Sequence, residues 1–121
     1  MLAKIMGSVI DMKIAITSEG KTLESKIDTR FGRCAYFIIF DIDTNSFEAV
    51  ENNNVNLTGG AGIQSGQLVI SKGVKAVITG KVGQNAYTTL NAAGIEIYLA
   101  ASGNIAEVIE KFKSNKLEKM D

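Results

Sequence analysis

The chain has 121 residues, the length of one domain, and its 45% hydrophobic content is sufficient for a core without disulfides. Thirteen basic residues balance thirteen acidic ones, so no overall charge attracts nucleic acid or an anionic membrane. Histidine is absent and only one cysteine is present, which excludes histidine catalysis, an internal disulfide and a paired-cysteine metal site. This composition predicts a cytoplasmic protein, and no apolar run is long enough to span a membrane.

The first eleven residues have no assigned place in the predicted fold. Their apolar run is short and ends at Asp11, and it lacks the small-residue cleavage pattern of a signal peptide. An upstream start, a tag remnant and an additional edge strand all remain open. We therefore treat residues 1–11 as an N-terminal extension and residues 12–121 as a single domain.

Three strands are predicted in the first half of the domain. Residues 13–17 form a β-branched run that a polar loop ends at Gly20. Residues 35–41 are aromatic and β-branched, and residues 47–52 alternate apolar with polar side chains after a turn. The second and third runs are expected to pair as a hairpin, with the alternating arm at the sheet edge.

The second half of the domain alternates helices with strands. A helix is predicted from about Ile63 to just before Gly73, and a short helix over residues 84–91. Strands are predicted at residues 75–79 and 95–99. A strand, a helix and a second strand in this order form a parallel pair.

The final helix has the clearest start signal in the chain. Asn104 and Glu107 have the spacing of a capping box, and an apolar face follows at Ile105, Val108, Ile109 and Phe112. The tail from Lys113 onward is expected to be a frayed end or a last turn.

These elements predict an α/β fold of order β β β α β α β α. The expected sheet is mixed and five-stranded, with strand order 3-2-1-4-5 and helices on both faces. The carboxyl ends of four strands then share one edge, to which the loops at residues 29–34, 53–62, 80–85 and 100–103 return. That edge is the expected ligand site, because open α/β sheets bind ligands there.

The loop from Thr29 to Cys34 has the composition of an anion-binding site. Arg30 and Arg33 offer planar guanidinium donors, and Gly32 lets backbone amides approach a ligand. The alternative is structural: the two arginines are solvated at a strand start, while Phe31 and Cys34 pack inward.

Two further glycine-containing segments precede helices. Gly59, Gly60, Ala61 and Gly62 could present amides to an anion at a helix start, or could form a tight turn and close helix packing that also involves Gly66. Gly80 and Gly83 lead into the next helix in the same way. At Asn104 ordinary capping is sufficient. Three helix starts are thus expected at one edge.

The runs Arg-Phe-Gly-Arg-Cys-x-Tyr-Phe at residues 30–37 and Gly-Gly-Ala-Gly-Ile-Gln at residues 59–64, taken together, resemble the dinitrogenase iron-molybdenum cofactor biosynthesis family. The resemblance extends over residues 12–118. It implies an RNase H-like fold without nuclease activity, in small proteins that bind or carry iron-sulfur or molybdenum-iron-sulfur clusters or their precursors. The cofactor-binding positions implied by this resemblance or by the loop pattern are Arg30, Phe31, Gly32, Arg33, Cys34, Gly59, Gly60, Ala61, Gly62, Gly80 and Gly83.

The sequence departs from the family at Arg30, where many relatives have histidine. An anionic cluster would then be held by charge and backbone donors, with Arg30 and Arg33 as counter-ions and Cys34 as the sole candidate metal ligand. The leading hypothesis is a non-enzymatic cluster carrier that works with cluster-assembly proteins. The alternative is a regulatory or scaffold domain without metal, for which an exposed Phe31 would anchor a partner.

A nuclease is disfavoured, although Asp41 and Asp43 provide paired carboxylates for metals. Both residues lie at the hairpin end, away from the predicted site. They are better explained as solvated turn residues.

Overall fold

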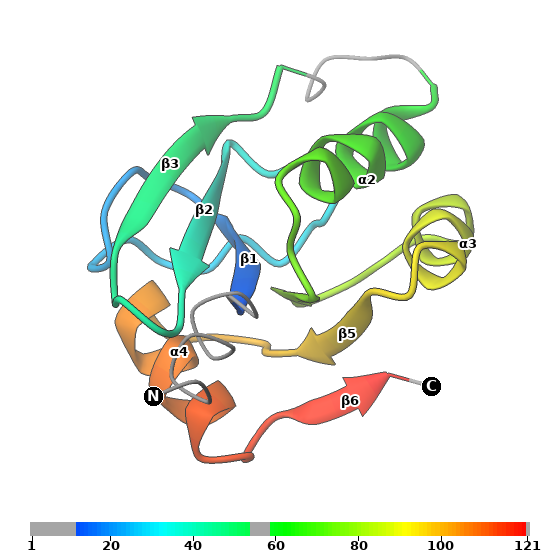
Figure 1. The fold of residues 1–121 in the computed structure, drawn as a ribbon. Coiled ribbons are helices and arrows are strands. Elements are labelled where there is room, and N and C mark those ends of the chain that lie inside the picture. Colours follow the sequence, from blue (N-terminus) through cyan, green and yellow to red (C-terminus); the bar gives the residue numbers. More distant parts are fainter. Residues whose placement is uncertain (1–11, 54–58, 121) are drawn as a thin grey trace.

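The computed structural model describes residues 12–53 and 59–120, which form six strands and three helices (Figure 1). The N-terminal extension, residues 1–11, lies outside the described residues. The strands are β1 (Lys13–Ser18), β2 (Tyr36–Asp41), β3 (Phe47–Glu51), β4 (Ala76–Thr79), β5 (Glu96–Leu99) and β6 (Glu118–Met120), and the helices are α2 (Ala61–Ser71), α3 (Gln84–Ala92) and α4 (Ile105–Lys113). Among the described residues, no helix has the length and apolar character needed to cross a bilayer.

All the strands belong to one mixed sheet of order β3-β2-β1-β4-β5-β6. β1, β4 and β5 pair in parallel, and β2 pairs antiparallel with both β1 and β3. The predicted order of the first five strands is therefore confirmed. The five-stranded count, and with it that detail of the RNase H-like prediction, is wrong because β6 adds a sixth strand.

The sixth strand is formed by part of the tail, for which the sequence predicts a frayed end or a last turn. Its three residues pair antiparallel with β5, and Tyr98 lies opposite Lys119. The chain reverses after α4 through Asn115, whose φ of 59° is left-handed, a conformation that asparagine tolerates better than most residues. Lys119 also forms an ion pair with Glu96 at 3.5 Å.

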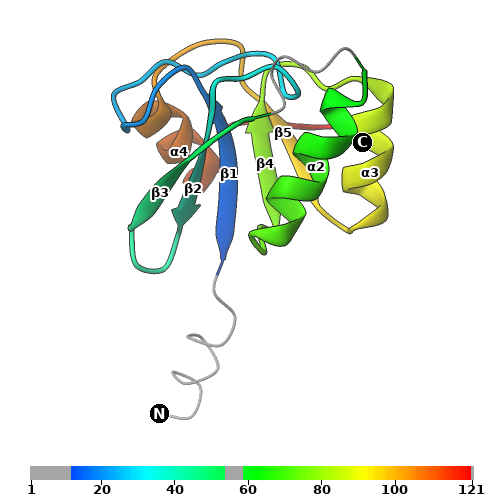
Figure 2. The same ribbon diagram turned by 90° about the horizontal axis from the view of Figure 1, so that it is seen from above.

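Helices cover both faces of the sheet, with α2 and α3 on one side and α4 on the other (Figure 2). The alternation along β1 shows why: Ala15 faces α2 and α3, whereas Ile14 and Ile16 face α4. Each face is completed by side chains of the neighbouring strands and of its own helices, such as Leu90 on one side and Val108 on the other. The sheet thus has a core on each face.

The start of α4 has the predicted capping box. Asn104 Oδ1 accepts a hydrogen bond from the Glu107 amide at 2.8 Å, and Glu107 Oε1 accepts one from the Asn104 amide at 2.9 Å. Two amides that the helix itself cannot satisfy are paired in this way. Glu107 also places a negative charge at the positive end of the helix.

The loops that follow β1, β4 and β5 gather at one edge of the sheet, and the β2–β3 hairpin turn lies at the opposite end (Figure 2). At that turn, Asp41 Oδ1 accepts hydrogen bonds from the amides of Asp43 and Thr44, at 2.9 and 3.2 Å. Asp41 thus shapes the turn, as its interpretation as a turn residue predicted, and the metal-site alternative has no support here.

Candidate anion-binding site

The loop between β1 and β2 crosses the carboxyl ends of β1 and β4. The Asp28 amide donates to the Thr17 carbonyl at 2.9 Å, and the Phe31 amide donates to the Lys81 carbonyl at 3.1 Å. Gly80 lies directly beneath this crossing, where an added Cβ would be 2.6 Å from the Thr29 Cβ. Gly80 therefore gives the loop room to cross, and it does not line the hollow described below.

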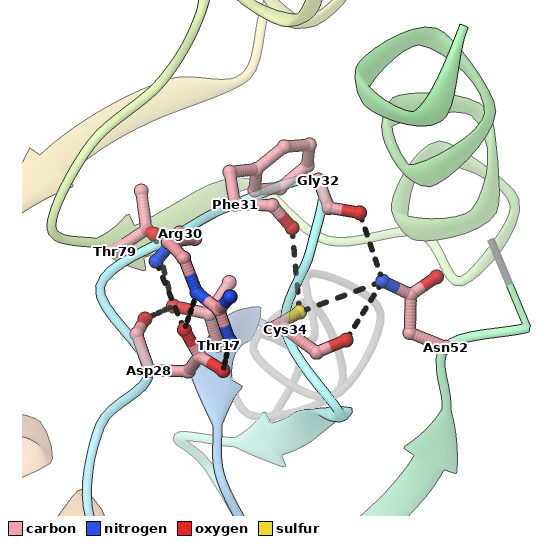
Figure 3. A network of polar contacts seen from close by, with 8 residues as sticks. All are labelled: Thr17, Asp28, Arg30, Phe31, Gly32, Cys34, Asn52 and Thr79. Atoms are coloured by element: carbon pink, nitrogen blue, oxygen red, sulfur yellow. Dashed lines mark hydrogen bonds and ion pairs between the residues drawn. The ribbon is translucent and has the colours of Figure 1, made fainter. Parts of the chain in front are cut away.

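A buried carboxylate organises the first part of this loop (Figure 3). The Asp28 side chain, only 5% exposed, accepts hydrogen bonds from Arg30: from the amide at 3.0 Å, Nε at 3.1 Å and Nη2 at 3.2 Å. The bond to Asp28 raises the pKa of Arg30. The charge of Arg30 is thus directed to its own loop.

Two buried hydroxyls fix the same loop to the sheet. Thr17 Oγ1 is hydrogen-bonded to the Asp28 carbonyl and lies 2.9 Å from Thr79 Oγ1 (Figure 3). Thr17 ends the predicted first strand, and Thr79 is the last residue of β4. The loop is therefore attached where two parallel strands end.

Phe31 and Cys34 point into the core, as the structural alternative predicted. Phe31 is 2% exposed, and its ring centroid lies 5.5 Å from that of Phe37. The Cys34 side chain is buried, and its Sγ donates to the Phe31 carbonyl at 3.3 Å. Burial, and secondarily the charge of Asp28, raises the pKa of Cys34 to about 12.

These placements bear on two expectations. The exposed Phe31 anchor is wrong, because the ring is covered by the core. Cys34 Sγ is buried, is hydrogen-bonded to the Phe31 carbonyl and does not line the hollow described below, so its position gives no support to the expected role as a metal ligand. Both residues support the loop from beneath.

Asn52, directly after β3, is a residue that supports the site and was not predicted from the sequence. Its Nδ2 donates to the carbonyls of Cys34 at 2.9 Å and Gly32 at 3.2 Å (Figure 3). Its Oδ1 accepts from Ser65 Oγ of α2 at 3.4 Å. The alternation of β3 was an available signal, because it places position 52 on the same face as Val50.

An open hollow of about 340 Å³ lies where this loop meets the starts of α2 and α3. It is lined by Gly32, Arg33, Gly60, Ala61, Gly62, Gly83, Gln84, Asn85 and Ala86. The expected convergence of Arg33 with Gly60 and Gly83 is thus observed. We refer to these nine residues as the Arg33 hollow.

Glycine allows the walls of the Arg33 hollow to approach each other closely. A Cβ on Gly32 would lie 3.1 Å from the Gly62 nitrogen, and one on Gly62 would lie 3.2 Å from the Ala86 Cβ. One turn further along, a Cβ on Gly66 would lie 3.0 Å from Thr89 Cγ2. The predicted close packing through Gly62 and Gly66 is confirmed.

Both helices direct the positive ends of their dipoles toward the Arg33 hollow. Gly60, with φ of 77°, precedes α2 and Gly83 precedes α3. The earliest helical bonds run from Gln64 to Gly60 at 3.0 Å and from Tyr87 to Gly83 at 2.9 Å, so the amides before them have no acceptor within the helix. Neither first turn contains an acidic residue, and no side chain of the described residues caps either start. Together with Arg33, these amides favour an anion.

Other predicted positions lie away from the Arg33 hollow. Arg30, Gly59 and Gly80 are absent from its lining. The start of α4 borders a different, larger hollow of about 570 Å³, whose walls include Glu19, Glu24 and Glu107. That hollow is acidic and its helix start is already capped, so it does not suit an anion. Two helix starts converge on the Arg33 hollow, rather than the expected three.

The described residues contain no group of three or more Asp, Glu, Cys or His side chains arranged to hold a metal ion. The lining of the Arg33 hollow likewise includes none of these four residue types. Its donors are a guanidinium group, side-chain amides and backbone N–H groups. This set can bind a preformed anion through charge and hydrogen bonds, and it does not provide a coordination shell for a bare cation.

Comparisons with known proteins identify relatives along nearly the whole chain. The model of the family described as dinitrogenase iron-molybdenum cofactor matches residues 12–115. The uncharacterized protein MJ0580 of Methanocaldococcus jannaschii is 34% identical over 113 residues, which cover 91% of this chain and 92% of that protein.

Two solved structures are similar in both sequence and fold. The apo form of the orange protein from Desulfovibrio gigas has a TM-score of 0.87 and 33% identity, and the match covers 90% of this chain and 92% of that one. A NifB-like protein of the DUF35 family from Thermotoga has a TM-score of 0.80 and 40% identity, with 89% and 92% covered. The chain belongs to the dinitrogenase iron-molybdenum cofactor family.

Proposed function

We propose that this protein is a non-enzymatic, cytoplasmic carrier that holds an anionic iron-sulfur or molybdenum-iron-sulfur cluster, or a precursor of one, in the Arg33 hollow. It would receive the cluster from cluster-assembly proteins or deliver it to them. The observation that carries this proposal is the meeting of Arg33 with two helix starts that have no acidic residue in their first turns.

The donor set favours a preassembled cluster over a free metal ion. Sulfide-rich clusters are anionic and accept hydrogen bonds at sulfur, which suits guanidinium and amide donors. The volume of about 340 Å³ is roughly ten times the ~30 Å³ that a water molecule occupies in the liquid. A guest larger than a single ion therefore fits the space.

The lining of the hollow also favours binding over catalysis. It contains no carboxylate, thiol or imidazole, the groups that most often act as general acids, general bases or nucleophiles. Membership in a family named for a cofactor supports the same role, as does the similarity to a protein solved in an apo form. A hydrolase acting on phosphorylated molecules has no comparable support.

Anaerobic reconstitution tests the proposal. Purified protein is incubated with iron, sulfide and tetrathiomolybdate and then desalted, and retained metal is measured by elemental analysis and visible absorption. We expect retention by the wild type and about a 10- to 100-fold weaker affinity in Arg33→Ala, the range expected for a charge-assisted hydrogen bond of ~1.5–3 kcal/mol. Affinity should also fall as salt concentration rises.

Lys81→Ala is the matched control. It removes one positive charge from the same edge of the sheet, and Lys81 does not line the hollow. Its affinity should stay close to that of the wild type. Absence of retained metal in the wild type, or equal losses in the two variants, would contradict the proposal.

A further inference from the structure

Asn52 joins two segments that form the wall of the Arg33 hollow. Its side chain comes from the end of β3, is 2% exposed and does not line the hollow. From there it bonds to the loop before β2 (Figure 3) and, through Ser65, to α2. Asn52 therefore lies behind the proposed binding surface and can affect it only through other residues.

The bonds of Asn52 bracket Arg33 in sequence. Nδ2 carries two hydrogens, and its acceptors include the carbonyls of Gly32 and Cys34, the residues immediately before and after Arg33, together with Cys34 Sγ at 3.8 Å. The Gly32 carbonyl belongs to the peptide group directly before Arg33, and the Cys34 carbonyl belongs to the peptide group after Cys34, so the backbone is held on both sides of Arg33. The position from which the Arg33 side chain extends is fixed as a result.

The oxygen of the Asn52 side-chain amide sets the position of the Arg33 loop relative to α2. Asn52 Oδ1 accepts from Ser65 Oγ, and Ser65 is a fully buried residue of the second turn of α2. The Asn52 backbone amide also donates to the Ala35 carbonyl at 3.0 Å. One buried residue thus connects β3, the Arg33 loop and the helix whose start faces the hollow.

We propose that Asn52 is a positioning residue that holds Arg33 beside the starts of α2 and α3, and so sets the affinity of the hollow for its anionic guest. This inference rests on the proposed function. Asn52 acts through Arg33 and does not touch the guest. Its contribution to binding should therefore depend on the presence of the Arg33 guanidinium.

A double-mutant cycle with tetrathiomolybdate as the probe tests this dependence. Equilibrium titrations compare wild type, Asn52→Ala, Arg33→Ala and the double variant. We expect Asn52→Ala to weaken binding about tenfold, equivalent to ~1.4 kcal/mol, and to cause little further loss when Arg33 is already alanine. Val108→Ala is the control for general destabilisation, because it opens a cavity under α4 on the other face of the sheet. It should lower the melting temperature and leave the affinity unchanged.

The possible outcomes are distinguishable. If the wild type does not bind the probe, the proposed function fails, and this inference fails with it. If the wild type binds and Arg33→Ala does not, but Asn52→Ala binds like the wild type, only the role of Asn52 is overturned. The same holds if Asn52→Ala costs an equal factor in both backgrounds.

A second variant keeps the test decisive if Asn52→Ala does not fold. Asn52→Asp retains the side-chain volume and the acceptor for Ser65, but it replaces the donating NH₂ with an oxygen. The same cycle is then run with this variant. Wild-type affinity in Asn52→Asp would overturn the inference.

Discussion

Cys34 offers a quantitative test of whether the only thiol of the protein is available for chemistry. Its pKa of about 12, against an ordinary value of 9.0, reduces the thiolate fraction about a thousandfold at any pH below 9. Because disulfide reagents react with the thiolate, we expect native Cys34 to react at least about a thousandfold more slowly than an exposed thiol. Full burial slows the reaction further.

The assay is the reaction with a chromogenic disulfide reagent at about pH 8, followed in native protein and in concentrated guanidinium chloride. A reference thiol is provided by a Cys34→Ala, Lys81→Cys variant, which has a single exposed cysteine at the same edge of the sheet. If native Cys34 reacts within about tenfold of that reference, the account of a closed, protonated thiol is refuted.

The same pKa has a consequence for stability. A pKa raised by folding stabilises the protein fully below pH 9, and that contribution is lost as the pH rises toward about 12. The stability of the wild type should therefore fall by up to ~1.4 kcal/mol per pH unit more steeply than that of Cys34→Ala over this range. Urea unfolding of the two proteins at several alkaline pH values measures the difference, and parallel pH curves would contradict the assignment.

Further variants test the packing of the loops and of the last helix. In urea titrations, Gly80→Ala should lower the free energy of unfolding by ~1–3 kcal/mol, because the added Cβ would overlap Thr29. Gly59→Ala is the control: Gly59 has open space around it, so the free energy of unfolding should change by less than ~0.5 kcal/mol. Asn104→Ala should cost ~1 kcal/mol by removing the cap of α4, and an unchanged melting temperature would contradict that role. Phe31→Ala should cost ~3–5 kcal/mol, as expected for a core aromatic residue, and a loss below ~1 kcal/mol would show that the ring is not part of the core.

The fold could be predicted where a pattern is local. The alternation of β3, the helix–strand succession and the spacing of Asn104 and Glu107 each reflect interactions within a few residues. β6 could not be found in this way, because three residues without β-branched side chains become a strand only through pairing with β5. Its position also depends on the turn at Asn115, which sequence patterns specify only weakly.

The position of the site could be predicted from the sequence, but the side chain that faces it could not. The edge that holds the Arg33 hollow follows from parallel strand order, so the convergence of the loops with Gly60 and Gly83 could be predicted. The sequence did not predict which of the two arginines faces the hollow. That choice depends on Asp28, which binds the Arg30 side chain and so directs it away from the hollow. A signal for this pairing was present in the sequence. An aspartate side chain often accepts a hydrogen bond from the backbone amide two residues later, as Asp28 does from Arg30.

The glycine-lined seam between α2 and α3 affects how the proposed cargo would enter and leave. Gly62 faces Ala86 and Gly66 faces Thr89 with no space for a methyl group at ordinary contact distance, so the two helices behave as one stiff wall. The facing segment around Arg33 is held as well, by the hydrogen bonds of Asn52 and by Phe31 and Cys34 in the core. Because both walls are held and the hollow is open, loading and unloading would proceed without a rearrangement of either wall.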